Sequence, residues 1–214
     1  MFASMRRYRV ASGGPDEFMR RVDATFADQI AAQTGFVSYE LIDCGDGDLF
    51  TLSIFDEAGQ AEASRALART WTDEHLRDID HTRFDAVHGE SVVGRAEAGM
   101  LEPGHVGGPR KSVSIRLYRV HRGTVHALLE HVDRAFADRM RAMDGFEASY
   151  LLDCGEGELL WLNYLRDPGA EADELLVRFV REELTDFRLE HVVSIRGERV
   201  VSRATERLLE PARA

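Results

Sequence analysis

The chain has few cysteines and no long apolar run: two cysteines occur among its 214 residues. Two thiols are too few for the disulfide framework of a small secreted scaffold. No segment offers the roughly 18 consecutive apolar residues that a transmembrane helix needs, and the N-terminal segment lacks the apolar core of a signal peptide. We therefore expect a cytoplasmic protein that does not enter a membrane.

Positive charge is also in short supply. The chain has 27 Lys and Arg against 38 Asp and Glu, which gives a net charge of −11. Nucleic-acid binding depends on neutralising phosphates with basic side chains, so we expect no nucleic-acid partner; the nearest basic cluster is Arg6, Arg7 and Arg9. Apolar residues make up 44 % of the chain, which is enough for a packed core.

Motifs for metals, phosphates and nucleophiles are missing as well. The acidic run 43–48 resembles a calcium loop, but its twelfth position is Ile54 instead of an acidic residue. His126 and His131 lie five apart, and therefore on different sides of a helix, which does not suit a two-histidine metal site. The chain has no glycine-rich phosphate loop, nucleophile elbow or CxxC pair. We expect no bound metal.

What the chain does have is an internal repeat. Residues 5–49 match residues 115–159 without a gap, with about 19 identical pairs out of 45. The register then shifts by two residues, and the match resumes where Trp71 stands opposite Phe179. Pro and Gly punctuate the segment between the copies. We predict a first repeat over residues 1–103, a linker over 104–110 and a second repeat over 111–214.

Each copy follows the order strand, helix, strand, strand, helix, strand. Residues 4–10 alternate like a strand, Pro15 and the acidic residues after it begin a helix, and Gly35 ends that helix. An apolar side chain at every fourth position marks the buried face of the helix. The remaining predicted elements are strands 36–43, 49–55 and 86–93 with a helix over 58–78, then strands 159–165 and 192–201 with a helix over 170–187.

This order is the split βαβ pattern of ferredoxin-like folds. We therefore predict an α+β fold made of two ferredoxin-like βαββαβ repeats. In the strands 49–55 and 159–165, apolar residues occupy both faces. One face packs against helices and the other needs a second sheet, so we expect the repeats to pack sheet to sheet as a pseudo-dimeric barrel.

These features resemble the dimeric α+β barrel superfamily, and within it the antibiotic-biosynthesis-monooxygenase-like (ABM) domains. The resemblance rests on the strand Tyr8-Arg9-Val10, the pair Gly35-Phe36, the hairpin Asp43-Cys44-Gly45-Asp46-Gly47 and the stretch from Ala63-Ser64 to Trp71, most of which recur in the second copy. In that family two subunits pair their sheets, so a tandem chain resembles a fused dimer. A further homodimer stays open.

The resemblance implies a pocket between sheet and helices in each half. Some members oxidise aromatic polyketides or quinols with no metal or flavin, which implies a monooxygenase that needs no cofactor and acts on a small aromatic or polyketide-like molecule. The alternative is a non-catalytic small-ligand-binding or stress-related protein of the same fold, and fold alone does not decide. Haem-degrading members use an Asn, a Trp and a His, and Trp71 with His75 or His81 could serve as the last two. The first strand has no Asn, however, and Phe179 replaces Trp71 in the second copy, which argues against that activity.

Four residues of the first copy are candidate catalytic groups. Tyr8 could donate a hydrogen bond to a substrate oxygen, although an amphipathic strand residue explains it as well. Trp71 and His75 lie one helical turn apart and face the same way, with the imidazole as a proton shuttle; a core Trp beside a histidine at the solvent edge is the alternative. His88 could bind an anionic or phenolate group, or be a surface residue.

Four residues of the second copy are candidate ligand-binding groups: Tyr118, Trp161, Asn163 and Arg196, of which Tyr118 matches Tyr8 and Arg196 matches His88. Trp161 and Asn163 stand where the first copy has the smaller Thr51 and Ser53. The larger pair could fill a space that the smaller pair leaves open, so we expect a pocket in one half only. Cys44 and Cys154 lie in equivalent hairpin turns and are interpreted as turn residues.

Overall fold

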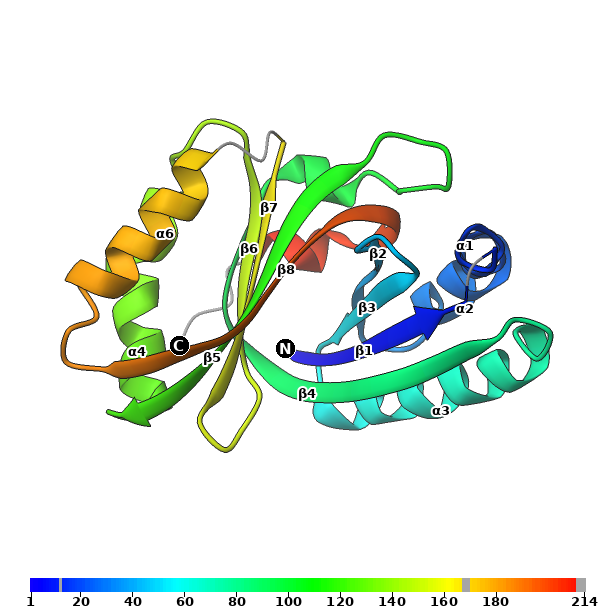
Figure 1. The fold of residues 1–214 in the computed structure, drawn as a ribbon, viewed down its shortest axis with the longest axis horizontal. Coiled ribbons are helices and arrows are strands. Elements are labelled where there is room, and N and C mark those ends of the chain that lie inside the picture. Colours follow the sequence, from blue (N-terminus) through cyan, green and yellow to red (C-terminus); the bar gives the residue numbers. More distant parts are fainter. Residues whose placement is uncertain (12, 167–169, 211–214) are drawn as a thin grey trace. The chain divides into compact units, whose positions relative to one another are not determined.

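The computed structural model describes residues 1–11, 13–166 and 170–210. Within this part of the chain, eight strands are hydrogen-bonded in the order β1-β3-β2-β8-β5-β7-β6-β4 and close into a barrel (Figure 1). The strands are β1 Phe2–Val10, β2 Phe36–Asp43, β3 Asp48–Phe55, β4 His81–Ala96, β5 Lys111–Arg122, β6 Phe146–Asp153, β7 Glu158–Leu165 and β8 Arg188–Ala204. The strand pairs β1–β3, β2–β3, β2–β8, β4–β6, β5–β7 and β6–β7 are antiparallel.

Helices follow the first, third, fifth and seventh strands of the chain. Two further short helical turns, η2 and η4, follow β4 and β8. The helical segments are α1 Pro15–Arg21, η1 Val22–Phe26, α2 Ala27–Ala31, α3 Ala58–His75, η2 Ala98–Leu101, α4 Val125–Val132, η3 Asp133–Ala137, α5 Asp138–Arg141, α6 Ala170–Glu182 and η4 Glu206–Leu209. Among the helices described, none combines the length and the apolar character that crossing a membrane requires.

Residue contacts divide the chain into two compact units that are not continuous in sequence. The first unit contains Met1–His88, Met100–Lys111 and Gly197–Leu208; the second contains Gly89–Gly99, Ser112–Arg196 and Leu209–Ala214. The long strands β4 and β8 therefore contribute one part to each unit. The end of β8 completes the first sheet by pairing with β2, and the end of β4 completes the second by pairing with β6.

This exchange of strand ends is absent from the sequence-based prediction, which ended the fourth strands at residues 93 and 201. The observed strands have 16 and 17 residues, about three times the usual length. A strand of that length can extend past the sheet in which it begins, so the fourth strand of each copy serves two sheets.

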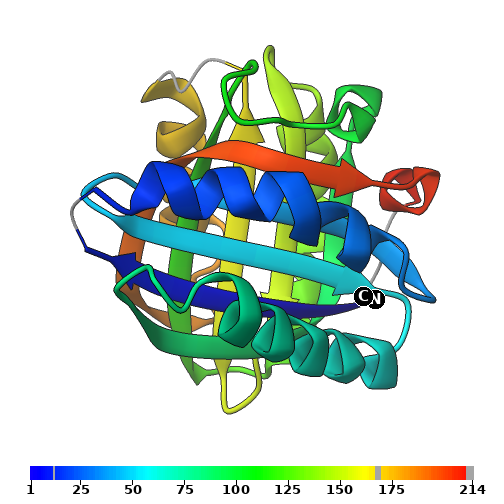
Figure 2. The ribbon, with the colours of Figure 1, turned by 90° about the vertical axis from the view of Figure 1, so that its right-hand side faces the viewer.

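In the first unit, α1, α2 and α3 cover the same face of β1 and β3 (Figure 2). The predicted stripe of the first helix is confirmed, because Phe18, Val22, Phe26 and Ile30 are all buried. The helix is interrupted by one π-helical turn, η1. Gly35 leads into β2 with φ +70°, and a Cβ there would lie 1.9 Å from Oε1 of Gln60, so only glycine fits this turn.

The segment between the repeats is held in the first unit by polar contacts. Gly104 exchanges two backbone hydrogen bonds with Ser202 of β8. The carboxylate of Asp23 accepts hydrogen bonds from the Val106 amide and the His105 ring, each at 2.9 Å. The segment that sequence analysis treated as a linker is thus a fixed part of the first unit.

Candidate active site

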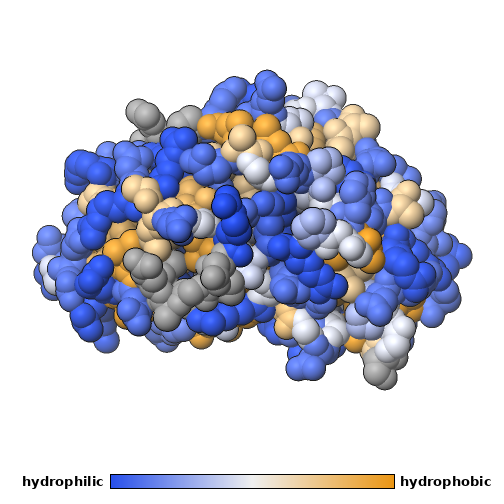
Figure 3. All heavy atoms as spheres, turned by 90° about the horizontal axis from the view of Figure 1, so that it is seen from above, coloured by the Kyte–Doolittle hydropathy of each residue, from blue (hydrophilic) through white to orange (hydrophobic). Residues whose placement is uncertain are grey.

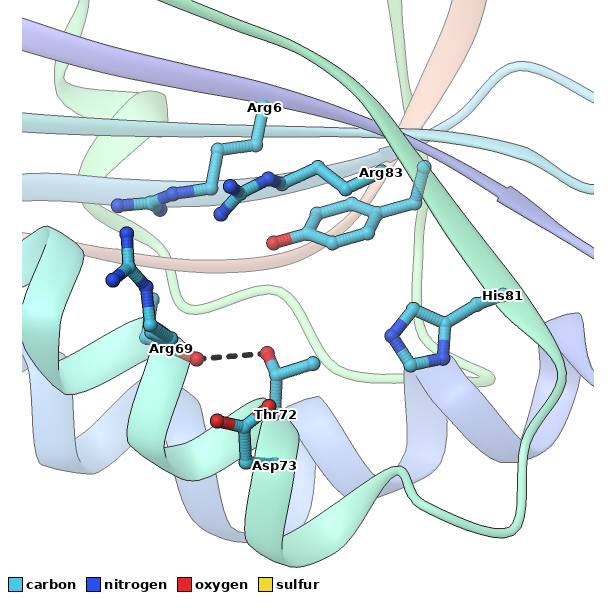
Figure 4. Close-up of a pocket in the computed structure, with 8 residues that line it drawn as sticks. Arg6, Arg69, Thr72, Asp73, His81 and Arg83 are labelled. Carbon is cyan, nitrogen blue, oxygen red and sulfur yellow. Dashed lines mark hydrogen bonds between the residues drawn. The ribbon is translucent and has the colours of Figure 1, made fainter.

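A cavity of about 300 Å³ lies in the first unit, between α3 on one side and β1 and β4 on the other (Figure 4). Its lining residues come from these three elements only: Arg6, Tyr8, Ala68, Arg69, Thr72, Asp73, His81 and Arg83. The volume is at the lower end of the range for small-molecule sites. It therefore suits a ligand of a few rings.

Local geometry explains why these residues meet. Alternate residues of a strand share a face, which brings Arg6 and Tyr8 to the helix-covered side of β1. Residues four apart on a helix share a face, which groups Ala68 with Thr72, and Arg69 with Asp73. The cavity has a floor and a mouth, because the β1 residues are buried while Arg69 and Asp73 are exposed.

Positive charge dominates one end of the cavity. The guanidinium groups of Arg6, Arg69 and Arg83 gather there, and His81 lies toward the other end (Figure 4). Arg6 is only 3 % exposed, and its buried Nη2 has no hydrogen-bond partner in the described part of the chain. Burial lowers the pKa of Arg6 below its usual range, and nearby Arg83 adds to this effect. The group nevertheless stays charged at neutral pH.

Tyr8 lies beside this charge and is 6 % exposed. Burial raises the pKa of its phenol, while the charges of Arg6 and Arg83 and a hydrogen bond with Thr72 oppose the shift. The Tyr8 ring packs against His81, with centroids 6.2 Å apart. The phenol is therefore protonated at neutral pH and available as a hydrogen-bond donor.

His81 has a defined tautomer in its neutral form. Its Nδ1 lies 2.8 Å from the carbonyl oxygen of Ile79. A carbonyl oxygen only accepts hydrogen bonds, so Nδ1 carries the proton and Nε2 keeps its lone pair. The imidazole can therefore act as a base through Nε2.

A row of polar atoms without partners continues from Arg6 along the sheet. Ser4 is two residues from Arg6 on β1, and Thr51 of β3 stands directly opposite Arg6. Both residues are buried, and the Oγ of Ser4 and the Oγ1 of Thr51 lack hydrogen-bond partners among the described residues. Buried polar atoms normally have partners, so three neighbouring orphan atoms mark this part of the sheet as unusual.

Of the four candidate catalytic residues, Tyr8 lines the cavity and Trp71 and His75 point elsewhere. Trp71 is buried, donates a hydrogen bond from Nε1 to Thr25 at 3.0 Å and packs on Phe26. His75 stacks on Trp71, with ring centroids 5.2 Å apart. Trp71 and His75 share one face of α3, and Trp71 on this face packs against Thr25 and Phe26. The adjacent face of α3, which carries Ala68 and Thr72, lines the cavity.

His88 lies on β4 outside the cavity lining. It is half-buried, and burial lowers its pKa, followed by the charges of Arg65 and Arg6. His88 thus experiences the same positive charge as the cavity without being part of its wall.

In the second unit, the four candidate ligand-binding residues do not form one group. Trp161 donates from Nε1 to Ser149 at 2.9 Å, and the Ser149 hydroxyl donates to Oδ1 of Asn163 at 2.8 Å. Tyr118 packs against His191, with ring centroids 5.5 Å apart. Arg196 is exposed. Trp161 and Asn163 therefore belong to one buried network around the Ser149 hydroxyl.

The space filled by Trp161 is also filled in the first unit. Trp161 meets Phe136 edge to face at 5.4 Å, and Tyr39 meets Phe26 in the same way at 5.3 Å. The large and the small residue have thus changed places between the two units. The first unit has the large Tyr39 and the small Thr51, whereas the second has the small Ser149 and the large Trp161 at the matching positions. Large and small neighbours compensate, so Thr51 and Ser53 do not by themselves open a pocket.

The difference between the units lies instead on the helix and the fourth strand. At the offset that aligns Trp71 with Phe179, four cavity positions become larger or apolar in the second unit: Leu176 for Ala68, Val177 for Arg69, Val180 for Thr72 and Leu189 for His81. Leu176 is buried and Val180 and Leu189 pack against the second core. Apolar side chains therefore occupy this place in the second unit.

The sequence-based prediction considered His81 only as a haem-degrading histidine and Arg6 only as part of a basic cluster, and it missed Arg69, Arg83, Thr72 and Asp73. A signal for Arg69 and His81 was present in the repeat, because these polar residues of the first copy stand opposite apolar residues of the second. Among the described residues, no group of three or more His, Cys, Asp or Glu side chains is arranged to hold a metal ion.

No protein-family model matches the chain, and no curated protein matches it either. Solved structures do. A putative monooxygenase from Fusobacterium nucleatum superposes with a TM-score of 0.65 at 6 % identity, covering 95 % of this chain and 94 % of that one. A putative monooxygenase from Lactobacillus acidophilus gives 0.62 at 13 % identity, covering 95 % of each chain.

An anthrone oxidase-like protein gives a TM-score of 0.54 at 12 % identity, covering 97 % of this chain and 94 % of that one. Chlorite dismutases and a putative dyp-type peroxidase share the fold as well. Identities this low show a common fold and do not carry an activity across. The chain thus has the α+β barrel fold, a closed antiparallel barrel with few helices.

Proposed function

We propose that the protein is a monooxygenase-like enzyme that needs no cofactor and oxidises a small phenol or enol in the cavity of the first unit. The observation that carries this proposal is that an imidazole with a free Nε2, a protonated phenol and a buried guanidinium face one small cavity. The fold shared with proteins described as putative monooxygenases and as anthrone oxidase-like supports it.

The proposed reaction begins with proton transfer to Nε2 of His81 from an acidic C–H or O–H of the substrate. Negative charge then develops on the substrate oxygen, where Tyr8 donates a hydrogen bond and Arg6 supplies a positive charge. Fixed donors and charges in a largely buried site stabilise such an anion strongly.

The anion itself is the reductant in this scheme. It passes one electron to O₂, and the resulting radical pair forms a C–O bond to give a peroxide anion. The imidazolium of His81 returns its proton to this anion, and loss of water from the hydroperoxide leaves a ketone. The sum is CH₂ + O₂ → C=O + H₂O, which balances without an external electron donor.

Haem does not suit this cavity. About 300 Å³ accommodates a few rings, which is less than a tetrapyrrole with its side chains. Three guanidinium groups also occupy the end of the cavity opposite His81. Haem therefore takes no part in the proposed reaction, and the Soret band of added haemin is expected to stay at the position of free haemin when the protein is present.

We also propose that the chain is a fused pair of ABM-like repeats, 1–103 and 111–214. The proposal rests on the sequence repeat and on the element order, which is the same from β1 to β4 and from β5 to β8. In this interpretation the second repeat has kept the fold and lost the cavity, while the first carries the activity.

The activity is tested with anthrone as the probe, by recording oxygen consumption and the carbonyl product. The wild-type protein is expected to consume one O₂ per anthrone converted, and His81→Gln is expected to slow turnover by about 100-fold or more, the range for a general base. His126→Gln, an exposed histidine of the second unit, is the matched control. Anthrone binding without oxygen uptake would instead favour a non-catalytic binding protein.

A further inference from the structure

The Arg6 side chain is a buried charge whose Nη2 has no hydrogen-bond partner among the described residues. A guanidinium is almost never fully buried unless it is paired, because removing an unpaired charge from water costs several kcal/mol. Arg6 is 3 % exposed, and the groups that influence it most after burial are the phenols of Tyr8 and Tyr39 and the positive charges of Arg83 and Arg65. The cavity is where a compensating anion would lie.

The rest of the lining favours an anion too. Arg69 and Arg83 add two positive charges, against the single carboxylate of Asp73. This local excess of positive charge contrasts with the net charge of −11 for the whole chain. One face of the molecule is shown in Figure 3, and most of it is hydrophilic. A positive cavity attracts anions over a distance of about one Debye length, roughly 8–10 Å.

The hydrogen-bond donors and the apolar wall of the cavity favour a carboxylate attached to a planar ring. A guanidinium presents two parallel N–H donors, which match the two oxygens of a carboxylate. Tyr8 and Thr72 of the lining carry hydroxyl groups, which can add hydrogen bonds to those of Arg6. The rings of Tyr8 and His81 and the methyl group of Ala68 provide an apolar wall, which suits a planar ring attached to the carboxylate.

The second unit differs at these positions. Arg116 stands at the place of Arg6 and has an interaction partner, and Leu176 and Leu189 stand at the places of Ala68 and His81. The charged and polar cavity lining of the first unit is therefore not repeated at the matching positions of the second. This makes Arg116 a natural control for Arg6.

We propose that the cavity of the first unit is a carboxylate-recognition site, in which a small aromatic carboxylate binds with its carboxylate on Arg6 and its ring between Tyr8, His81 and Ala68. As a statement about the substrate, this rests on the proposed function, because it adds a carboxylate to the phenol or enol that is oxidised. As a statement about binding, it holds without any turnover.

Isothermal titration calorimetry at low ionic strength tests the proposal, with benzoate as the probe and benzamide as its neutral isostere. Benzoate is expected to bind the wild-type protein with one site per chain. Arg6→Gln is expected to weaken binding at least tenfold, the change that corresponds to about 1.4 kcal/mol, whereas Arg116→Gln leaves it unchanged. Benzamide is expected to bind at least tenfold more weakly than benzoate.

Three results would overturn the proposal. The first is equal affinity for benzoate and benzamide, and the second is unchanged benzoate affinity in Arg6→Gln, checked for folding by circular dichroism. Arg83→Gln, at the exposed mouth, serves as a second variant and is expected to weaken binding less than Arg6→Gln. Binding of inorganic phosphate in place of benzoate would also refute it, since the site would then recognise a different anion.

The outcomes separate this inference from the proposed function. Benzoate binding that depends on Arg6, together with no oxygen uptake on anthrone or on an anthrone that carries a carboxylate, supports the carboxylate site and rejects the oxygenase. Oxygen uptake on anthrone that depends on His81, together with benzoate affinity that is unchanged in Arg6→Gln, supports the oxygenase and rejects the carboxylate site.

Discussion

Replacing Arg6 with methionine is expected to make the free protein more stable. Methionine keeps much of the length and apolar volume of the arginine stem and removes the buried charge whose Nη2 has no partner. Replacing buried ionic groups with apolar ones of similar volume stabilises proteins by about 1–4 kcal/mol. For Arg6→Met we expect a gain of about 1–3 kcal/mol in the free energy of unfolding. For a chain of this size that raises Tm by roughly 2–12 °C.

The measurement is urea unfolding followed by circular dichroism, with calorimetry alongside. Chloride is the only anion in the buffer, so that no carboxylate or phosphate binds in the cavity. Arg116→Met is the control and is expected to lower the free energy of unfolding, because Arg116 has an interaction partner that the substitution removes. Benzoate should stabilise the wild-type protein and not Arg6→Met, since a ligand of the native state adds stability only where it binds. A loss of more than about 1 kcal/mol in Arg6→Met would refute the reasoning and give Arg6 a structural role.

Two further predictions concern titratable groups. Burial raises the pKa of the Cys44 thiol to about 12, and Asp48 and Asp43 contribute; the thiol is therefore protonated at pH 8, and native protein should react with iodoacetamide far more slowly than protein in urea. Equal rates would contradict the burial. The pKa of His88, lowered by burial, Arg65 and Arg6, should rise in Arg6→Gln because one positive charge is removed; an unchanged or lower NMR titration midpoint would show that Arg6 does not act on it.

The repeat in the sequence predicted the elements well because each element is a local property. The stripe of Phe18, Val22, Phe26 and Ile30 requires only helical periodicity, and the hairpin glycines require only a tight turn. The structure extends the fourth strands and shortens the second helix to His75, since ends depend on neighbours that periodicity does not reveal.

The cavity could not be predicted in the same way, because its walls are three segments whose packing is a tertiary property. The helical spacing predicts that Trp71 and His75 share a face of the helix. It does not predict that the adjacent face, which carries Thr72, lies against β1 and β4. The expectation for Trp161 failed for a related reason. Only the structure shows that Tyr39 of a neighbouring strand takes the same space.

The exchanged strand ends have a consequence for how the chain is made. The sheet of the first unit contains β1, β2 and β3 from the first half of the chain, but the strand that pairs with β2 lies in residues 197–208. During synthesis, which proceeds from the N-terminus at roughly 5–20 residues per second, the edge of β2 stays open until almost the whole chain has emerged. An open edge is a site for pairing with other chains. The first half of this protein is therefore most exposed to misassembly while the second half is still being translated, and a chain ended near residue 110 would keep that edge permanently.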